Sequence, residues 1–170
     1  MSIDILLGKL AATSGINYNL ERITAALTLL GDPHKDLSYI HIAGTNGKGT
    51  TADFIAQSLE ATGKKVGLYT SPHLLSYAER FKINDKPISN SRLEYFLNII
   101  YKNTAEVQLT EFEILTLIAF LFFQEEQPDY VIMEAGLGGR LDATNVISPL
   151  ISIITTISFD HQDLLGNSIE

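Results

Sequence analysis

Apolar residues recur at helical spacing in several stretches of the chain. In one of them they fall at Ala52, Ile55, Ala56 and Leu59, which share one face of a helix that Gly63 can end. A similar amphipathic stretch over residues 20–30 stops at a Gly-Asp-Pro sequence, a common helix ending. The pattern predicts helices over residues 20–30, 52–59, 91–102 and 111–125.

Shorter stretches that are apolar throughout alternate with these helices. Such stretches are typical of strands buried on both faces, as in a parallel sheet covered by helices. The pattern therefore predicts an α/β fold with a mostly parallel sheet and helices on both faces. The strands are expected over residues 37–43, 66–69, 130–133 and 150–155, with a long polar loop over 71–90.

The segment HIAGTNGKGT, residues 41–50, joins the first predicted strand to the helix over 52–59. It departs from the pattern G-x-x-x-x-G-K-[ST], because Ile42 replaces the first glycine and Gly49 follows Lys48. The strand–turn–helix context still favours a phosphate site over a glycine-rich turn with an incidental lysine, since backbone N–H groups at a helix N-terminus bind anions. Thr50 or Thr51 can place a hydroxyl on a magnesium ion. The glycines that let a ligand approach the backbone are Gly44, Gly47 and Gly49.

Polar sequence also follows the other predicted strands. Residues 70–73 follow the second, Glu134 closes the third, and Asp160 and His161 lie beyond the fourth. In a parallel sheet these ends share one edge, where ligands bind, and an acid there can hold magnesium beside phosphates. Each feature alone is more typical of a solvated or structural residue, but together they predict a ligand site. A dinucleotide site at 136–141 is excluded, because Leu141 stands where G-x-G-x-x-G requires glycine.

Composition narrows the class of protein. A chain of 170 residues with 45% apolar residues suits one domain with a real core. Twenty acidic and twelve basic residues give a net charge of -8, which argues against nucleic-acid binding. The absence of cysteine is compatible with the cytoplasm, and no signal peptide is visible. The most apolar run, Ile114–Phe123, is too short to cross a membrane.

Five sequence stretches, in order, resemble one family. GTNGKGT, TSPHL…ER, TEFE, EAGLGGRLDATN and DHQDLLG are similar to motifs of the folylpolyglutamate synthase/dihydrofolate synthase family, which belongs to the Mur-ligase-like, ATP-dependent amide synthetases. The resemblance runs from about Asn19 to the last residue, and in this family the late hydroxyl of the loop is the normal form. The resemblance implies a Mur-ligase-like central domain with a P-loop. It also implies that ATP is a co-substrate and that Mg²⁺ is the bound metal.

The resemblance also implies site residues. The loop after the Ser-Pro-His stretch at 71–73, with Glu79 and Arg80, resembles the family's mobile loop near the substrates. The catalytic residues would be Lys48, Glu134 and His161. Those at the ATP phosphates would be Gly44, Thr45, Asn46, Gly47, Lys48, Gly49 and Thr50. Magnesium would be held by Thr50, Ser71, Glu134 and His161. The pterin pocket would be formed by Thr110, Glu111, Phe112, Glu113, Leu141, Asp142 and Ala143. An aromatic face suits a flat pterin ring, and a carboxylate can accept from its amino-pyrimidine edge.

The implied reaction is ATP-dependent addition of glutamate to dihydropteroate, folate or both, through an acyl phosphate. One alternative is a cell-wall Mur ligase, but only 43 residues precede Gly44 and a glycine follows Lys48. The other is a non-catalytic nucleotide-binding module, but the metal residues are present. The chain stops within the family's DHQDLLG signature, so residues 1–170 are expected to be the N-terminal part of the ATP-binding domain, without the rest of that domain or a C-terminal domain. This part alone is expected to be inactive and to expose apolar surface.

Overall fold

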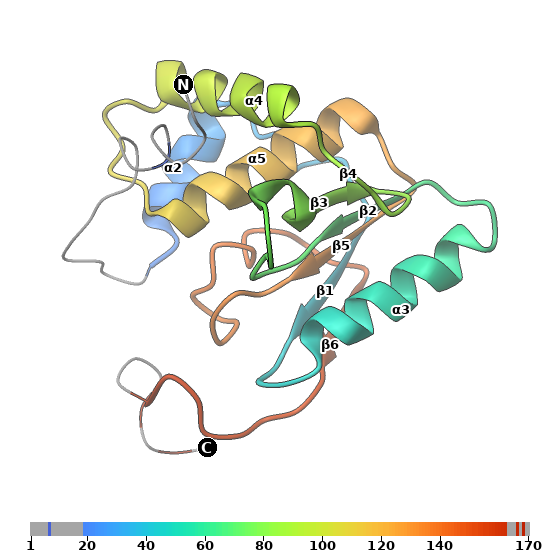
Figure 1. The fold of residues 1–170 in the computed structure, drawn as a ribbon. Helices are drawn as coiled ribbons and strands as arrows, with labels where there is room; N and C mark the ends of the chain where they lie inside the picture. Colours follow the sequence, from blue (N-terminus) through green and yellow to red (C-terminus); the bar gives the residue numbers. More distant parts are fainter. Residues whose placement is uncertain (1–6, 8–18, 163–165, 167, 169–170) are drawn as a thin grey trace.

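The structure is a computed structural model and describes residues 7, 19–162, 166 and 168. It has a mostly parallel sheet in the order β4-β3-β2-β5-β1-β6 (Figure 1). The four predicted strands are confirmed, and they pair in parallel as β2-β5-β1-β6. The strands are β1 Tyr39–Ala43, β2 Val66–Tyr69, β3 Phe81–Ile83, β4 Lys86–Pro87, β5 Tyr130–Glu134 and β6 Ile151–Ile154.

Helices cover both faces of the sheet, as the sequence predicted. In Figure 1, α2, α4 and α5 lie on one face and α3 lies on the other. Two separate apolar clusters agree with this, since one contains the buried residues of α2, α4 and α5 and the other those of α3. The helices are α2 Glu21–Leu29, α3 Lys48–Glu60, α4 Asn90–Asn103 and α5 Glu111–Glu126, with a 3-10 turn, η1, at Tyr77–Arg80.

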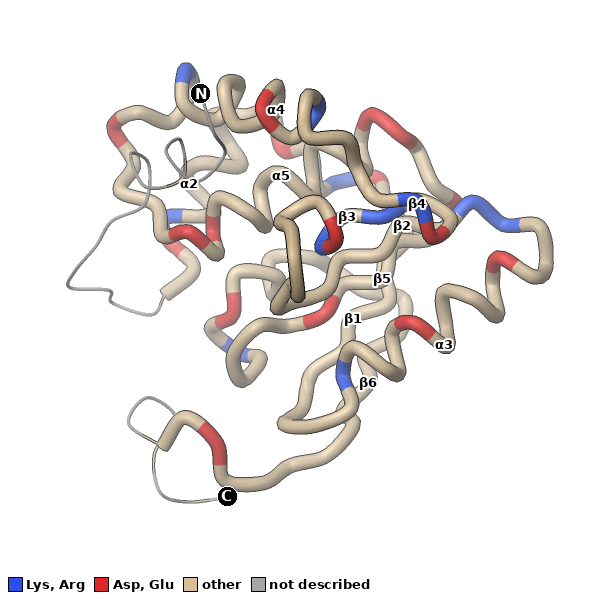
Figure 2. The backbone as a smooth tube through the Cα atoms, viewed as in Figure 1, with Lys and Arg blue, Asp and Glu red and all other residues tan. Residues whose placement is uncertain are grey.

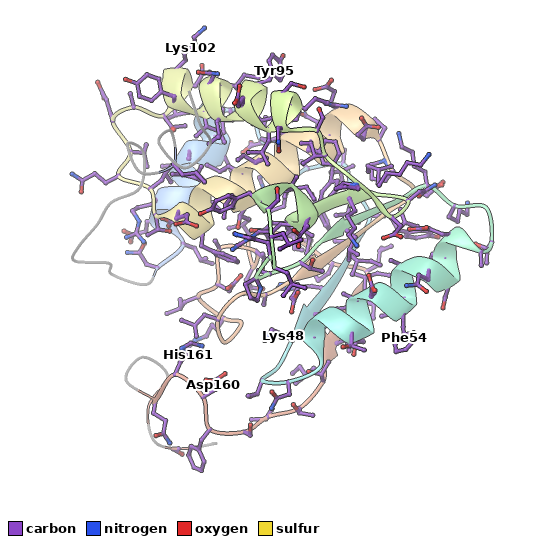
Figure 3. The ribbon with its side chains drawn as sticks, in the orientation of Figure 1. Lys48, Phe54, Tyr95, Lys102, Asp160 and His161 are labelled. Carbon is purple, nitrogen blue, oxygen red and sulfur yellow. The ribbon has the colours of Figure 1, made fainter. Side chains whose placement is uncertain are left out.

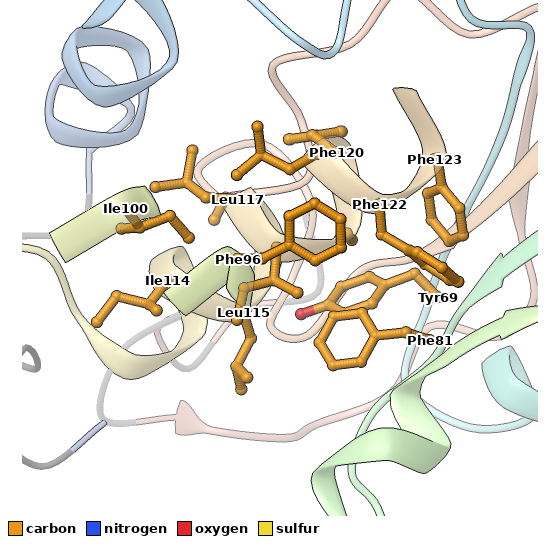
Figure 4. Close-up of a cluster of buried hydrophobic side chains, with 14 of the residues drawn as sticks. Tyr69, Phe81, Phe96, Ile100, Ile114, Leu115, Leu117, Phe120, Phe122 and Phe123 are labelled. Atoms are coloured by element: carbon orange, nitrogen blue, oxygen red, sulfur yellow. The ribbon is translucent and has the colours of Figure 1, made fainter. Parts of the chain in front are cut away.

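Helix α5 is the centre of the larger cluster. Its residues from Glu113 to Phe123 are all buried, because α2, α4 and the sheet surround the helix. Aromatic side chains of α4 and α5 meet those of β2 and β3 there, as Phe96, Phe122, Tyr69 and Phe81 show in Figure 4.

The N-terminus of α5 is fixed by polar contacts. The Thr110 hydroxyl accepts from the Glu113 backbone N–H, and the Glu113 carboxylate accepts from the Thr110 N–H. Arg22 of α2 contacts both oxygens of the same carboxylate, at 3.2 Å each. Thr110 and Glu113 therefore cap the helix and join it to α2.

The predicted loop over 71–90 was wrong in part, because it contains η1 and the β3–β4 hairpin. Strands of three and two residues are too short to show a period along the sequence. The local signal was the Asn84-Asp85 turn, where both residues have positive φ, of 45° and 58°, as a tight two-residue hairpin turn requires. Figure 2 shows basic and acidic residues around this hairpin. Among them, Lys82 and Asp85 form an ion pair at 3.0 Å.

Strand β6 lies at an edge of the sheet and pairs with β1 alone among the described strands. Leu150 and Ile154 are each 65% exposed, and Ile151 is 54% exposed. The expected exposed apolar surface is therefore present, and it lies on and beside β6. Within the described part of the chain, no helix is both long enough and apolar enough to cross a membrane.

Candidate functional site

The glycine-rich loop of residues 44–47, the predicted phosphate site, connects β1 to α3 at the carboxyl edge of the sheet. Gly47 adopts a left-handed conformation, with φ of 83°, and α3 begins at Lys48. The first N–H groups of a helix have no partner within the helix, so they can bind an anion here. The Lys48 ammonium donates to the carbonyls of Gly44, at 2.9 Å, and Thr45, at 3.2 Å, and so lies over the loop.

The end of β6 holds this loop in place. The Thr155 hydroxyl donates to the Asn46 carbonyl at 2.8 Å, and the Thr156 carbonyl accepts from the Thr45 N–H at 2.7 Å. The Thr156 hydroxyl also accepts from the Asn46 N–H at 3.1 Å. Sequence analysis noted only Asp160 and His161 beyond this strand and missed the contact of its two threonines with the loop. The available signal was a pair of hydroxyl residues ending a strand.

Glu134, at the end of β5, lies beneath the loop. Its carboxylate is buried and accepts from the Ser71 backbone N–H at 3.0 Å. A Cβ added at Gly49 would lie 3.4 Å from the same carboxylate, so the start of α3 approaches it closely. Burial raises the pKa of Glu134, and the Ser71 N–H and the Lys48 charge oppose that shift. The structure therefore brings Ser71 and Glu134 together, as the sequence predicted.

His161 occupies a different position. It is exposed on the segment after β6, and its Nε2 lies 3.7 Å from Asp160 (Figure 3). Lys48, Asp160 and His161 all line one pocket of about 300 Å³, together with the loop after β5. Among the residues that the structure describes, no three His, Cys, Asp or Glu side chains gather as a metal-binding group. Thr50 is exposed in the first turn of α3. A role of His161 and Thr50 at a metal stays a prediction.

Asp142 organises the loop between β5 and β6. Its Oδ2 accepts from the Leu137 N–H at 2.8 Å, and its Oδ1 accepts from the Thr144 N–H at 2.9 Å and the Thr144 hydroxyl at 2.6 Å. Asp142 and the adjacent Ala143 are buried, whereas Leu141 is 45% exposed. The carboxylate is thus fixed from within its own loop.

Phe112 lies between that loop and β2. A Cβ at Gly136 would meet the Phe112 ring at 2.6 Å, and the ring centroid of Phe112 lies 6.2 Å from that of Tyr69. The neighbouring Glu111 accepts from the Tyr77 hydroxyl at 2.9 Å, which joins α5 to η1. The structure therefore brings Phe112 next to the loop that contains Asp142.

The segment after Ser71 is folded on itself. The Glu79 carboxylate accepts from the backbone N–H groups of Leu74, Leu75 and Ser76 at 2.7–3.0 Å, and these bonds lower its pKa. Arg80 donates from Nε to His73 Nδ1 at 2.9 Å. Both residues thus shape this segment.

A buried histidine, His41, and a half-buried one, His34, should make stability depend on pH. Burial lowers the pKa of His41, against the opposing charge of Asp142, and burial also lowers the pKa of His34. Because the unfolded chain then takes up protons that the folded chain does not, the free energy of unfolding should fall as pH drops below about 6.5. Urea unfolding at about pH 7 and about pH 5.5 should show a smaller loss in His41→Gln than in the unsubstituted protein. The double variant with His34→Gln should show the smallest loss, and an unchanged pH dependence in it would contradict the assignment.

Residues 42–170 match the Mur ligase middle domain. The chain is 42% identical over 163 residues to the dihydrofolate synthase/folylpolyglutamate synthase of Bacillus subtilis, covering 92% of this chain and 38% of that protein. It is 41% identical to the folylpolyglutamate synthase of Lacticaseibacillus casei, covering 87% of this chain and 36% of that protein.

Solved structures agree with these relatives. E. coli FolC in complex with DHPP and ADP superimposes with a TM-score of 0.94 at 37% identity, covering 99% of this chain and 41% of that one. An FPGS-AMPPCP-folate complex gives a TM-score of 0.91 at 36% identity, covering 99% and 43%. The chain thus spans about two fifths of the length of the proteins it matches.

Proposed function

The chain belongs to the folylpolyglutamate synthase/dihydrofolate synthase family of Mur ligases, and from this premise we propose that it forms part of an ATP- and Mg²⁺-dependent ligase that adds glutamate to dihydropteroate, folate or both. The observation that supports this most directly is the loop at the start of α3, where Lys48 and the first helix N–H groups lie close to the buried carboxylate of Glu134. The negative charge of ATP phosphates is stabilised by a lysine and by backbone N–H donors of this kind. The relatives with bound ADP or AMPPCP support the same assignment.

The reaction proceeds in two steps that need no protein nucleophile. A carboxylate oxygen of the pteroate substrate attacks the terminal phosphorus of ATP, ADP leaves, and an acyl phosphate forms. The glutamate amine then attacks the acyl carbon, loses a proton, and expels phosphate to leave an amide. Lys48 exchanges its loop carbonyl partners for phosphate oxygens and offsets the charge that builds there.

The residues near the loop fit a magnesium ion. Mg²⁺ prefers hard oxygen ligands and is often held by one or two carboxylates together with substrate phosphates and water. Glu134 would supply a carboxylate, and Ser71 and Thr50 would supply hydroxyls. His161, which lies on the exposed segment after β6, would be a further ligand. The bound ion would neutralise phosphate charge. Glu134 must be ionised for this role; burial raises its pKa, and the Ser71 N–H, the Lys48 charge and the Gly49 N–H oppose that shift.

The pterin ring would bind beside Phe112 and Asp142. Phe112 offers an aromatic surface next to the loop that contains Asp142. A carboxylate has about four acceptor sites, and three at Asp142 are used inside the loop, which leaves one on Oδ2 for the ring's amino group. Thr110 and Glu113 would support the pocket by capping α5, and Glu111, Leu141 and Ala143 would border it.

Asp142→Ala should weaken binding of the pteroate or folate substrate. The change removes the proposed acceptor and leaves buried donors unpaired, at about 1–3 kcal/mol for each. Calorimetric titration with pteroate and with an ATP analogue should show a loss of about tenfold or more for the first and a much smaller loss for the second. Equal weakening of both ligands would instead indicate a general folding defect and contradict the assignment.

The direct test is an assay of the protein at its natural length with ATP, Mg²⁺, glutamate and either dihydropteroate or tetrahydrofolate. Glutamate-dependent release of ADP and phosphate with at least one acceptor is expected. Residues 1–170 alone should show no ligation, because proximity of all reactants is worth about 7–11 kcal/mol of the barrier and this part would lack some of the binding surface. If the protein at its natural length ligates glutamate to neither acceptor, the proposed function is wrong.

A further inference from the structure

A short chain of buried hydrogen bonds leads from strand β1 to Asp142. His41 lies in the middle of β1 and is 6% exposed, and Thr144 is fully buried. The His41 Nε2 lies 2.8 Å from the Thr144 hydroxyl oxygen, and that oxygen lies 2.6 Å from Asp142 Oδ1. These groups come from segments that are 103 residues apart in the sequence.

Elementary hydrogen-bond chemistry fixes the direction of this chain. An ionised carboxylate can only accept, so the single hydroxyl proton of Thr144 is donated to Asp142. The hydroxyl oxygen must then accept from His41, which places a proton on Nε2. The burial that lowers the pKa of His41 is consistent with a neutral ring in this tautomer.

The chain determines how Asp142 is oriented. Two of the contacts to Asp142 come from Thr144, one from its N–H and one from its hydroxyl, and both go to Oδ1. Leu137 N–H contacts Oδ2, so the remaining acceptor position lies on Oδ2 and its direction is set by the fixed Oδ1. A carboxylate that could rotate would present that position in many directions and would lose affinity for a ring held elsewhere.

We propose that His41 and Thr144 are positioning residues for the pterin-binding carboxylate, with His41 fixing the Thr144 hydroxyl and the hydroxyl fixing Asp142. The proposal rests on the proposed function, because it assumes that Asp142 accepts from the substrate. It adds two residues that the sequence did not assign to the pocket: Thr144, which directly follows Ala143 in EAGLGGRLDATN, and His41, on the strand that leads into the phosphate loop.

Paired variants of Thr144 test the proposal in the protein at natural length. Thr144→Val removes the hydroxyl with little change of shape, and Thr144→Ser keeps it. Thr144→Val takes the hydroxyl donor from Asp142 Oδ1 and leaves the His41 Nε2–H without its acceptor. We therefore expect it to raise the KM for pteroate by about tenfold, while the KM for ATP changes by less than about twofold. Thr144→Ser should restore most of the affinity.

A second pair tests the other end of the chain. His41→Leu removes the donor, whereas His41→Gln retains an amide N–H that can reach the hydroxyl. The first should raise the KM for pteroate selectively and the second should not. A pteroate KM unchanged in both Thr144→Val and His41→Leu, or parallel increases in both KM values with a lower Tm, would overturn the proposal.

Hydrogen exchange separates this proposal from the function itself. The backbone N–H groups of Leu137 and Thr144 donate to Asp142, so both should exchange faster in Thr144→Val if the carboxylate becomes mobile. If the unsubstituted protein binds no pteroate, the proposed function is refuted and the positioning role with it. Faster exchange in Thr144→Val would in that case still confirm the hydrogen-bond chain. Unchanged exchange in a protein that binds pteroate would refute the positioning role alone.

Discussion

Replacing Lys48 with alanine is expected to lower the ligation rate of the natural-length protein by about a hundredfold or more, the scale of losing one preorganised charge contact worth roughly 3 kcal/mol. The Lys48 ammonium already lies over the loop, within 3.2 Å of two of its carbonyls. Only a short movement separates it from a phosphate bound at the start of α3. Alanine removes the charge without disturbing the helix, since alanine has the highest helix propensity.

Single-turnover measurements with saturating ATP and pteroate give the rate of the chemical steps. Lys35→Ala serves as the matched control, because Lys35 is an exposed lysine whose ion pair with Asp32 lies outside the site. That control should retain its rate. A Lys48→Ala protein with near-normal turnover would exclude Lys48 from the catalytic machinery and weaken the case for a phosphate loop.

Gly44→Ala should be nearly as harmful, for a different reason. Gly44 has a φ of 134°, which side chains rarely adopt, and an added Cβ would lie 2.2 Å from the Thr155 hydroxyl and 3.0 Å from the Thr156 carbonyl. Backbone strain costs about 1–3 kcal/mol and forced packing about as much again, so the loop must move away from β6. We expect kcat/KM for ATP to fall by about a hundredfold.

Two further variants separate the sources of this effect. Gly63→Ala introduces a Cβ at a positive φ of 82° with no atom within 4 Å, so it measures backbone strain alone and should affect stability but not ATP use. Adding Thr155→Ala to Gly44→Ala removes the closest contact but leaves the backbone contact with Thr156. The double variant should therefore recover little activity, and full recovery would show that the Thr155 side chain alone was the obstacle.

The parallel strands and the strand-end cluster could be predicted because they depend on local patterns. Apolar runs identified β1, β2, β5 and β6, and the rule that parallel strands end at a common edge brought Ser71 and Glu134 together. The β3–β4 hairpin was missed because its strands are too short for a period to appear, although Asn84-Asp85 is a turn signal.

The polar contacts that fix the site could not be predicted from local patterns. Thr155 contacts Asn46 across 109 residues, and His41 contacts Thr144 across 103. Such partners become neighbours only when the strand order is known, and a buried histidine in an apolar strand gives no sign of which residue it meets. The internal contacts of Asp142 are local, to Leu137 and Thr144, and were missed for a different reason: the resemblance implied only a carboxylate that accepts from the pterin ring.

The alternation of side chains along β1 makes its length as important as its composition. Tyr39 packs in the larger apolar cluster, and Ile40 and Ile42 pack in the cluster beneath α3, so His41 lies on the same face as Tyr39. Inserting one residue between Ile40 and His41 would turn the imidazole toward the apolar cluster that packs against α3. If instead the strand kept its pairing after the insertion, the glycine loop would be displaced from the end of β6. A substitution on this strand therefore changes one side chain on one face, whereas a change of chain length disturbs both ligand regions at once.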